Sequence, residues 1–253
     1  MAVHSATDWK VIGIDPAPSK ETVAFDGAQF HVCLPDGVNA LIAAQTGDRD
    51  RVLVLWDAPL RMDPGEYYKR AVDVDAKKLV ASWSSVLEPK AVGVAAAAQC
   101  PHNILSMAVL GLPMGVPRHG LQLLADASAL EAGGRWVAEV HPAVALGWWY
   151  ARQGAGSAVR LPRYKGNDGM VDKVRGDLVE LLQPLRAFIG PEAWAFLDSD
   201  AGGGSPLKND DQLDAWVAWL LGRLLLAGRA ELWRGADAAA VQRDGGYYVL
   251  PRD

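Results

Sequence analysis

The sequence predicts an α/β protein in which helices cover both faces of a mixed sheet. Three stretches, at residues 11–14, 52–56 and 136–140, are apolar almost without interruption. A strand with one face in water alternates apolar and polar residues, so these three are expected to be buried on both faces. Half of the 253 residues are hydrophobic and 22% are charged. The chain can therefore bury a large core, which the ten Trp side chains help to fill.

The first half of the chain predicts the mixed character of the sheet. Residues 11–14 form the expected first strand, and the Asp15-Pro-Ala-Pro18 turn closes it. Two further strands are expected at residues 22–25 and 30–34, joined by a tight turn at Asp26-Gly27. These three strands predict an antiparallel meander. A crossover helix at residues 38–45 then leads to the buried strand at residues 52–56.

The second half is predicted to be mainly helical. Helices are expected at residues 67–87, 120–131, 143–152, 168–188, 192–197 and about 210–227, and a closing strand at residues 247–250. Residues 92–117 show no clear pattern, and the Gly-rich residues 198–205 are expected to be mobile. No linker requires a second domain, so residues 1–253 are expected to form one domain.

Charge and composition exclude some classes of protein. The net charge of −5 argues against a protein that coats nucleic acid through bulk electrostatics, although a local basic strip remains possible. Cys33 and Cys100 match no metal or redox spacing. The first ten residues do not resemble a signal peptide, and residues 216–227 are too short to span a bilayer. We expect a cytoplasmic protein without a membrane partner, and its oligomeric state is open.

Three acidic residues stand at the ends of the apolar strands. Asp15 follows the first strand, Asp57 follows residues 52–56, and Glu139 lies near the end of the third. Each acid alone could cap a turn. In open α/β sheets, however, ligands bind beyond the carboxyl ends of the strands. Three acids at such ends together predict a site at one edge of the sheet.

More acids open the last long helix. If Asn209 caps this helix, Gln212 can complete a capping box, and Asp210 and Asp211 favour the helix dipole. Asp214 lies a turn further in and is followed by apolar residues, so it is expected to point inward. Asp211 and Asp214, three residues apart, can face one site.

Clustered carboxylates predict a bound cation. They repel one another and take up protons unless a cation offsets their charge. All-oxygen ligands suit Mg²⁺ or Mn²⁺, and two such ions can stabilise both the attacking and the leaving oxygen of a phosphodiester. The residues therefore favour metal-assisted phosphoryl transfer.

The chain resembles the domain-of-unknown-function 429 family over about residues 11–226, because five motifs occur in the order seen in that family. They are Ile12-Gly-Ile-Asp15, Trp56-Asp-Ala-Pro-Leu60, Glu139-Val-His-Pro-Ala143, Tyr164-Lys-Gly166 and Asp211-Gln-Leu-Asp-Ala215. Members of this family are regarded as predicted nucleases with a ribonuclease-H-like fold. The resemblance thus implies one such domain, with a helical insertion around residues 62–132. It also implies catalytic roles for the strand and helix acids, with Mg²⁺ or Mn²⁺ held by Asp15, Asp57, Glu139 and Asp214.

Other residues are candidates for substrate binding. His141 is a candidate proton shuttle or ligand, although a His-Pro step also commonly ends a strand. Arg163 and Lys165 belong to a basic stretch that could hold a phosphate backbone, with Tyr164 stacking on a base. The stretch also includes Arg160, Lys173 and Arg175. A solvated loop and helix face would explain these residues equally well.

The favoured function is therefore a metal-dependent nuclease or related phosphodiester hydrolase, with DNA and RNA both open as substrates. The first alternative is a kinase or ATPase with an actin-like fold. Such proteins need backbone N–H groups in the turn after the first strand, where Pro16 and Pro18 have none. The second alternative is an inactive scaffold that binds a partner.

Overall fold

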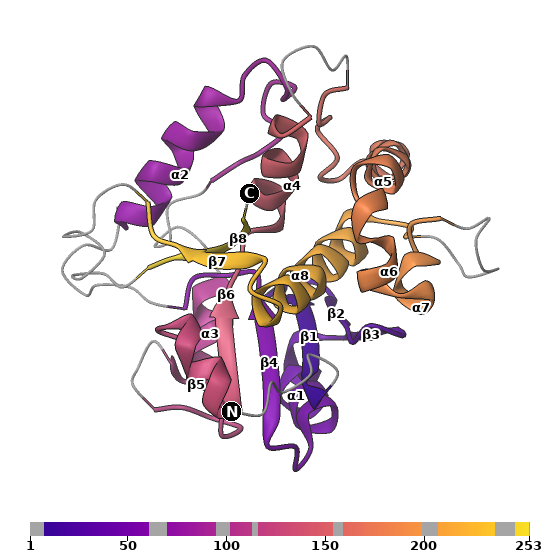
Figure 1. Ribbon diagram of the computed structural model, residues 1–253. Helices are drawn as coiled ribbons and strands as arrows, with labels where there is room; N and C mark the ends of the chain where they lie inside the picture. Colours follow the sequence, from indigo (N-terminus) through magenta and orange to yellow (C-terminus); the bar gives the residue numbers. More distant parts are fainter. Residues whose placement is uncertain are drawn as a thin grey trace.

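A six-stranded mixed sheet forms the centre of the protein. The computed structural model describes residues 8–60, 70–94, 102–112, 116–153, 159–198, 207–235 and 246–252. The strands lie in the order β3-β2-β1-β4-β6-β5, and Figure 1 shows the sheet between its helices. Their bounds are β1 Lys10–Asp15, β2 Thr22–Phe25, β3 Phe30–Cys33, β4 Arg51–Trp56, β5 Gln122–Leu123 and β6 Gly134–Glu139.

The directions of the strands confirm the predicted fold class. β1, β2 and β3 form an antiparallel meander, whereas β4 is parallel to β1, and β6 is parallel to β4 and β5. The mixed sheet is compatible with a ribonuclease-H-like fold. In register, Ile14 of β1 pairs with Trp56 of β4, which pairs with Glu139 of β6. The carboxyl ends of these three strands therefore meet at one edge, which is where the candidate site lies.

Helices cover both faces of the sheet, as predicted. One face of the sheet packs against the larger hydrophobic core, and most residues of the long helix α8 belong to this core. α1 and α3 cover the other face through a second, smaller core. The helices on the first face are α2 Ala71–Ser82, α4 Pro142–Ala151, α5 Asp168–Leu181 and α8 Asp210–Leu226, and those on the second are α1 Val38–Thr46 and α3 His102–Leu110. The short helices α6 (Arg186–Ile189) and α7 (Pro191–Trp194) lead toward α8.

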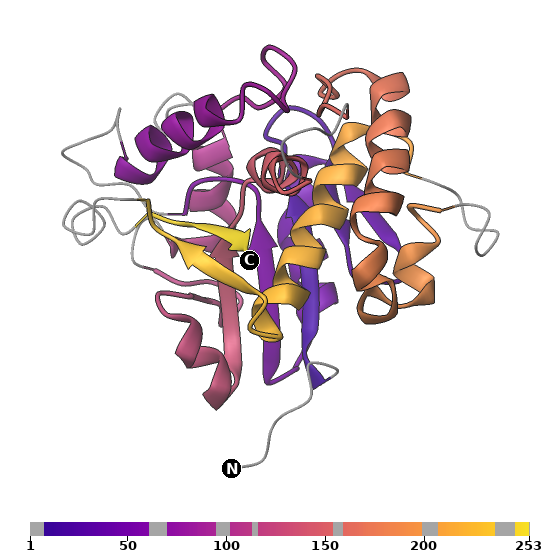
Figure 2. The same ribbon diagram turned by 45° about the horizontal axis from the view of Figure 1, so that its top comes forward.

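Helix α8 lies unusually close to the sheet. Figure 2 shows α8 running along β1, beside α5. Gly13 of β1 has no side chain, and a Cβ there would stand 2.1 Å from the carbonyl oxygen of Ala215 and 2.3 Å from the amide nitrogen of Trp219. Gly222 makes a similar approach, since its Cβ would stand 2.2 Å from a methyl carbon of Leu55. The two glycines thus fix the distance between α8 and the strands that carry Asp15 and Asp57.

Some elements differ from the prediction. The prediction of a helix at residues 120–131 is wrong, because the short strand β5 and the 3-10 helix η5 (Ala127–Ala132) occupy this stretch. Asp126 caps η5 by accepting a hydrogen bond from the Ser128 amide, which starts a new element inside the expected helix. Helix α3 lies within residues 92–117, where the sequence shows no clear secondary-structure pattern. The Gly-rich segment expected to be mobile lies almost wholly outside the described residues.

The predicted closing strand exists, but it does not join the main sheet. β8 (Tyr248–Pro251) pairs antiparallel with β7 (Ala230–Trp233) in a separate two-stranded ribbon. The ribbon packs against α4 and α8 beside the end of β6. Among the described helices, none is long and apolar enough to cross a membrane.

Candidate active site

Asp15 and Asp57 lie side by side at the carboxyl ends of β1 and β4. The two strands are parallel and in register up to Ile14 and Trp56. The Asp57 amide then donates a hydrogen bond of 3.0 Å to the carbonyl of Ile14, which continues the ladder by one residue. Since residues in register on parallel strands point to the same face, both carboxylates face α8. This part of the predicted cluster is present.

Helix α8 brings two further carboxylates to this edge. Asn209 caps the helix, and its side chain accepts a 2.9 Å hydrogen bond from the Gln212 amide. Asp211, in the first turn, shares a hydrogen bond with Asp15. Asp214, one turn further, is completely buried, as the sequence predicts. The cap fixes where the helix begins, and therefore which carboxylates turn toward β1.

Asp214 is held by two neighbours on the loop before α5. The Tyr164 hydroxyl donates a 2.8 Å hydrogen bond to one carboxylate oxygen. The Lys165 ammonium forms an ion pair with the other. The next residue, Gly166, donates its amide to Asp210 at 3.1 Å and has a φ of +70°. The motif Tyr164-Lys165-Gly166 thus binds the loop before α5 to the first two turns of α8.

The electrostatics of the cluster show an excess of negative charge. Burial, with the nearby charges of Asp57 and Asp211, raises the pKa of Asp15 well above its ordinary value, although Lys165 opposes the rise. Burial raises the pKa of Asp57 to about 6, with a further rise from the charge of Glu139, although Lys165 again opposes the rise. Asp211 forms a 2.5 Å ion pair with Lys20. The two lysines leave part of the carboxylate charge uncompensated.

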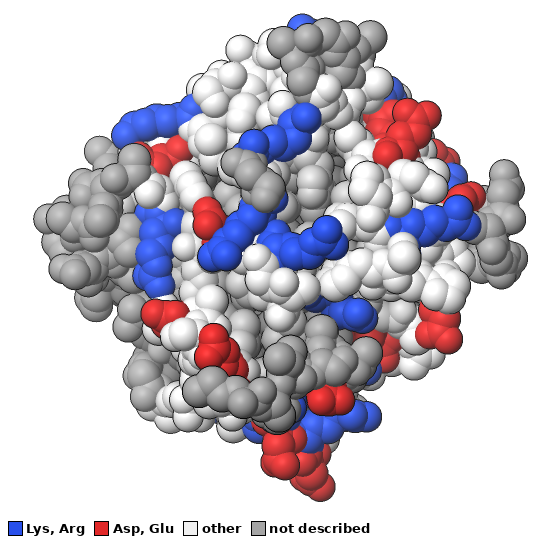
Figure 3. All heavy atoms as spheres, viewed as in Figure 1, with Lys and Arg blue, Asp and Glu red and all other residues white. Residues whose placement is uncertain are grey.

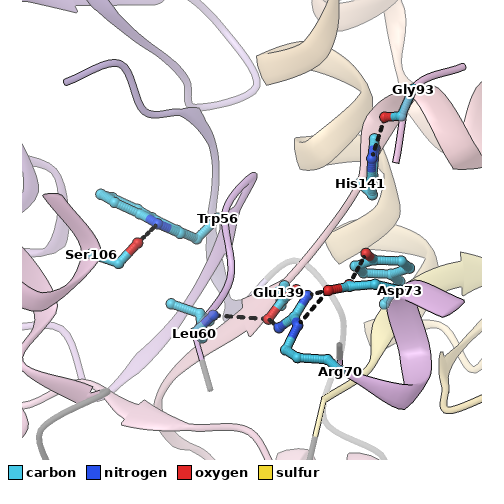
Figure 4. A network of polar contacts seen from close by, with 9 residues as sticks. Trp56, Leu60, Arg70, Asp73, Gly93, Ser106, Glu139 and His141 are labelled. Carbon is cyan, nitrogen blue, oxygen red and sulfur yellow. Dashed lines mark hydrogen bonds and ion pairs between the residues drawn. The ribbon is translucent and has the colours of Figure 1, made fainter. Parts of the chain in front are cut away.

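Glu139 differs from the prediction, because it belongs to a separate buried network. In register with Trp56, it lies on the opposite face of the sheet from Asp57. Arg70 donates to both of its oxygens, at 2.6 and 2.8 Å, and the Leu60 amide donates to one of them at 2.8 Å (Figure 4). Glu139 therefore positions the loop after β4, and it acts on the aspartates only through its charge, which raises the pKa of Asp57.

Arg70 connects Glu139 to the C-terminal ribbon. It forms a second, two-pronged ion pair with Asp73 of α2, at 2.7 and 3.0 Å. Asp73 also accepts a 2.6 Å hydrogen bond from the Tyr248 hydroxyl of β8. Arg70, Asp73 and Tyr248, together with Lys20 of the cluster, were not predicted as site residues from the sequence. Their separation along the chain gives no local signal.

His141 lies next to this network at the start of α4. Its Nε2–H donates a 3.1 Å hydrogen bond to the carbonyl of Gly93 (Figure 4). Its ring meets that of Tyr248 edge to face. Burial, with the positive charge of Lys165, lowers its pKa to about 4, so the imidazole is neutral at neutral pH. Its buried Nδ1 has no hydrogen-bond partner among the described residues. A free acceptor near the cluster suits a substrate hydroxyl or a water molecule.

The basic stretch is only partly available for substrate. Tyr164 is fully buried, so the prediction that its ring stacks on a base is wrong. Arg160 and Arg175 donate to backbone carbonyls, and Lys173 pairs with Asp177. The side chain of Arg163 is exposed, and that of Lys165 is 43% exposed although its ammonium pairs with Asp214. Figure 3 shows further Lys and Arg side chains across the middle of the face with α8 and the β7–β8 ribbon.

The donor set suits a hard cation held by few protein ligands. Within the described part of the chain, no group of three His, Cys, Asp or Glu side chains converges closely enough to hold one ion. The predicted four-carboxylate arrangement is therefore not present as these side chains lie. Mg²⁺ commonly keeps several waters and binds one or two carboxylates plus substrate phosphates. The adjacent carboxylates of Asp15 and Asp57 fit that mode.

One family model matches the chain. It is described as a protein of unknown function, DUF429, and it covers residues 13–239. This match confirms the family resemblance drawn from the five motifs. No curated protein and no solved structure matched the chain.

Proposed function

This chain belongs to the DUF429 family of proteins of unknown function, and we propose that it is a metal-dependent phosphodiester hydrolase acting on nucleic acid. The proposed site is the aspartate cluster at the carboxyl end of the sheet. It consists of Asp15, Asp57, Asp211 and Asp214, with Lys165 among them.

The observation that carries this proposal is the pairing of Asp15 and Asp57. Their strands place two carboxylates next to each other at a partly buried edge, and α8 adds Asp211 to them. Neighbouring carboxylates raise a carboxyl pKa, and the charges of Asp57 and Asp211 raise that of Asp15 in this way. A dication would relieve this repulsion, and the close packing of α8 on β1 at Gly13 keeps Asp211 near Asp15.

The residues divide into distinct roles under this proposal. Asp15 and Asp57 would hold a Mg²⁺ or Mn²⁺ ion, which when bound polarises a phosphoryl oxygen and stabilises charge in the transition state. Lys165 compensates the buried charge of Asp214, and its side chain as a whole is 43% exposed. Arg163, exposed on the same loop, would contact a phosphate backbone.

The turn after β1 does not favour the kinase or ATPase alternative. Pro16 and Pro18 have no N–H groups, and the Ala17 amide between them donates a 3.0 Å hydrogen bond to the Thr22 hydroxyl. A phosphate loop needs several free amides that converge on the ligand. This turn has none to offer over those three residues.

A cleavage assay tests the proposed function. Single-stranded and duplex DNA and RNA are incubated with the full chain and either Mg²⁺ or Mn²⁺, with a chelator in a parallel reaction. We expect cleavage of at least one of these nucleic acids that stops on chelation. Asp57→Asn should lower the rate by roughly 10²-fold or more, because even residues behind a metal ligand cost up to about that much when replaced.

The control replaces an acid outside the cluster. Asp172→Asn removes an exposed carboxylate of α5 that pairs only loosely with Arg175, at 3.4 Å, and should leave the rate unchanged. Cleavage that survives both chelation and Asp57→Asn would show that the activity does not depend on the cluster. Absence of cleavage, with a melting temperature that rises on addition of ATP, would favour the kinase or ATPase class.

A further inference from the structure

A cavity of about 380 Å³ lies at the start of β1, at the opposite end of the strand from Asp15. Its walls come from the start of β1, the turn between β2 and β3, the short helices α6 and α7, and the neighbouring part of α8 (Figure 1). Trp9, Ile189 and Trp219 make much of this wall apolar. The volume falls within the range of small-molecule sites, roughly 300–1,000 Å³, which are likewise mostly apolar with a few polar groups.

Arg223 of α8 lines this cavity and has no partner for its charge. Its guanidinium lies over the rings of Phe188 and Trp219, at 5.3 and 5.5 Å from their centroids. In the part of the chain that the structure describes, its buried Nε has no hydrogen-bond acceptor, and no acid offsets the burial that lowers the pKa of Arg223. The two rings and the C-terminal end of the helix dipole favour a cation here. Neither provides the anion that a partly buried guanidinium usually has.

The other charged residues that line the cavity limit what Arg223 can bind. Lys10 and Asp26 form an ion pair with each other at 2.9 Å, so neither is free for a ligand. Glu192 is exposed in the first turn of α7 and forms no ion pair with Arg223. The lining thus holds two positive and two negative side chains. A ligand with a single negative charge suits this balance better than a doubly charged phosphate.

We infer that this cavity binds a small organic monocarboxylate with an apolar body, and that the carboxylate pairs with the guanidinium of Arg223. A guanidinium can donate two parallel N–H groups to one carboxylate, which fixes the orientation of the ligand. The apolar body then lies against Trp9, Ile189 and Trp219. This binding site is separate from the aspartate cluster, needs no metal ion and does not depend on the proposed function.

Calorimetric titration of the full chain with two simple acids, phenylacetate and hexanoate, tests the inference. We expect at least one of them to bind at a single site per chain. The uncharged amide of the acid that binds has nearly the same shape, and it should bind roughly 10-fold or more weakly, because hydrogen bonds to charged groups are the stronger ones. Failure of both acids to bind would overturn the inference. Tighter binding of phenyl phosphate than of either acid would overturn the assignment of a monocarboxylate.

Two arginine variants place the bound acid in this cavity. Arg223→Met removes the charge but keeps an unbranched side chain, and it should weaken binding of the acid roughly 10-fold or more while binding of the amide stays the same. Arg223→Lys keeps a charge without the two parallel N–H groups, and it should weaken binding less if the Met variant fails to fold. The matched control is Arg229→Met, because Arg229 lies over the same Phe188 ring, at 5.7 Å, but does not line the cavity. Unchanged binding in both Arg223 variants, or an equal loss in the Arg223 and Arg229 Met variants, would overturn the inference.

Discussion

Gly13→Ala should destabilise the protein by about 3 kcal/mol or more, at or above the upper end of the usual cost of overpacking. The added Cβ would meet the backbone of α8 at 2.1 and 2.3 Å. A flexible side chain could rotate away from such a contact, but a helix backbone can only move as a whole. The helix would have to shift away from β1, and Asp211 and Asp214 would shift with it. Chemical denaturation followed by tryptophan fluorescence measures the loss of stability.

Gly176 provides the control for this substitution. It lies in the exposed part of α5, and a Cβ there meets nothing within 4 Å. Gly176→Ala should therefore be neutral or should stabilise the protein by up to about 1 kcal/mol through helix propensity. Equal stability of the Gly13 and Gly176 variants would contradict the close packing of α8 on β1.

Arg70→Met should destabilise the protein by about 3–5 kcal/mol, the usual cost of removing one partner from a buried ion pair. Arg70 is 2% exposed and serves both Glu139 and Asp73. Its loss leaves two buried carboxylates without their cation. The expected loss should diminish in acid, because protonation of the carboxylates removes their uncompensated charge. Denaturation curves at several pH values measure both effects.

Arg163→Met is the control for Arg70, since Arg163 is exposed and its removal should change stability little. A loss below about 1 kcal/mol for Arg70→Met, within the range of surface ion pairs, would show that the network does not hold the fold together. The Mn²⁺ affinity of Glu139→Gln tests the role of Glu139 separately. If Glu139 only positions the loop at Leu60, the variant still binds Mn²⁺. If Glu139 is a metal ligand, the variant loses Mn²⁺ binding.

The sequence predicted the parts of the site that depend on local pattern. Asp15 and Asp57 follow apolar strands, and two such parallel strands bring their ends together whatever else the chain does. Asn209 and Gln212 mark the start of α8, and the apolar residues after Asp214 indicate that this acid is buried. Periodicity and capping are short-range properties, so they can be read without the structure.

The sequence could not predict the parts that depend on distant partners. Glu139 also ends an apolar strand, but its face is decided by its register with Trp56, and its partner Arg70 lies 69 residues earlier. Tyr164 stands in a basic stretch that is typical of a surface loop, yet its hydroxyl is needed by Asp214, 50 residues later. A buried carboxylate must find donors, and the sequence does not show from where.

The central claim is that the cluster of Asp15 and Asp57 binds a dication, and Asp57→Asn makes this claim testable by thermal melting. The pKa of the Asp57 carboxyl is raised to about 6 in the folded chain, so its protonated form stabilises the fold. That stability is present in acid and is lost as the pH rises through about 6. At neutral pH without metal, the Asn variant should therefore be more stable than the unaltered protein, by roughly 1–3 kcal/mol.

The most direct measurement is the melting temperature of both proteins at neutral pH, without metal and with excess Mn²⁺. Without metal, the Asn variant should melt a few degrees higher, because about 1 kcal/mol corresponds to roughly 2–4 °C in a chain of this size. With Mn²⁺, the unaltered protein should gain about 2.7 kcal/mol when the ion is at about 100 times its Kd, and the variant should gain much less. The difference between the two melting temperatures should then become smaller or change sign. An equal gain in both proteins, or no gain in either, would contradict the account.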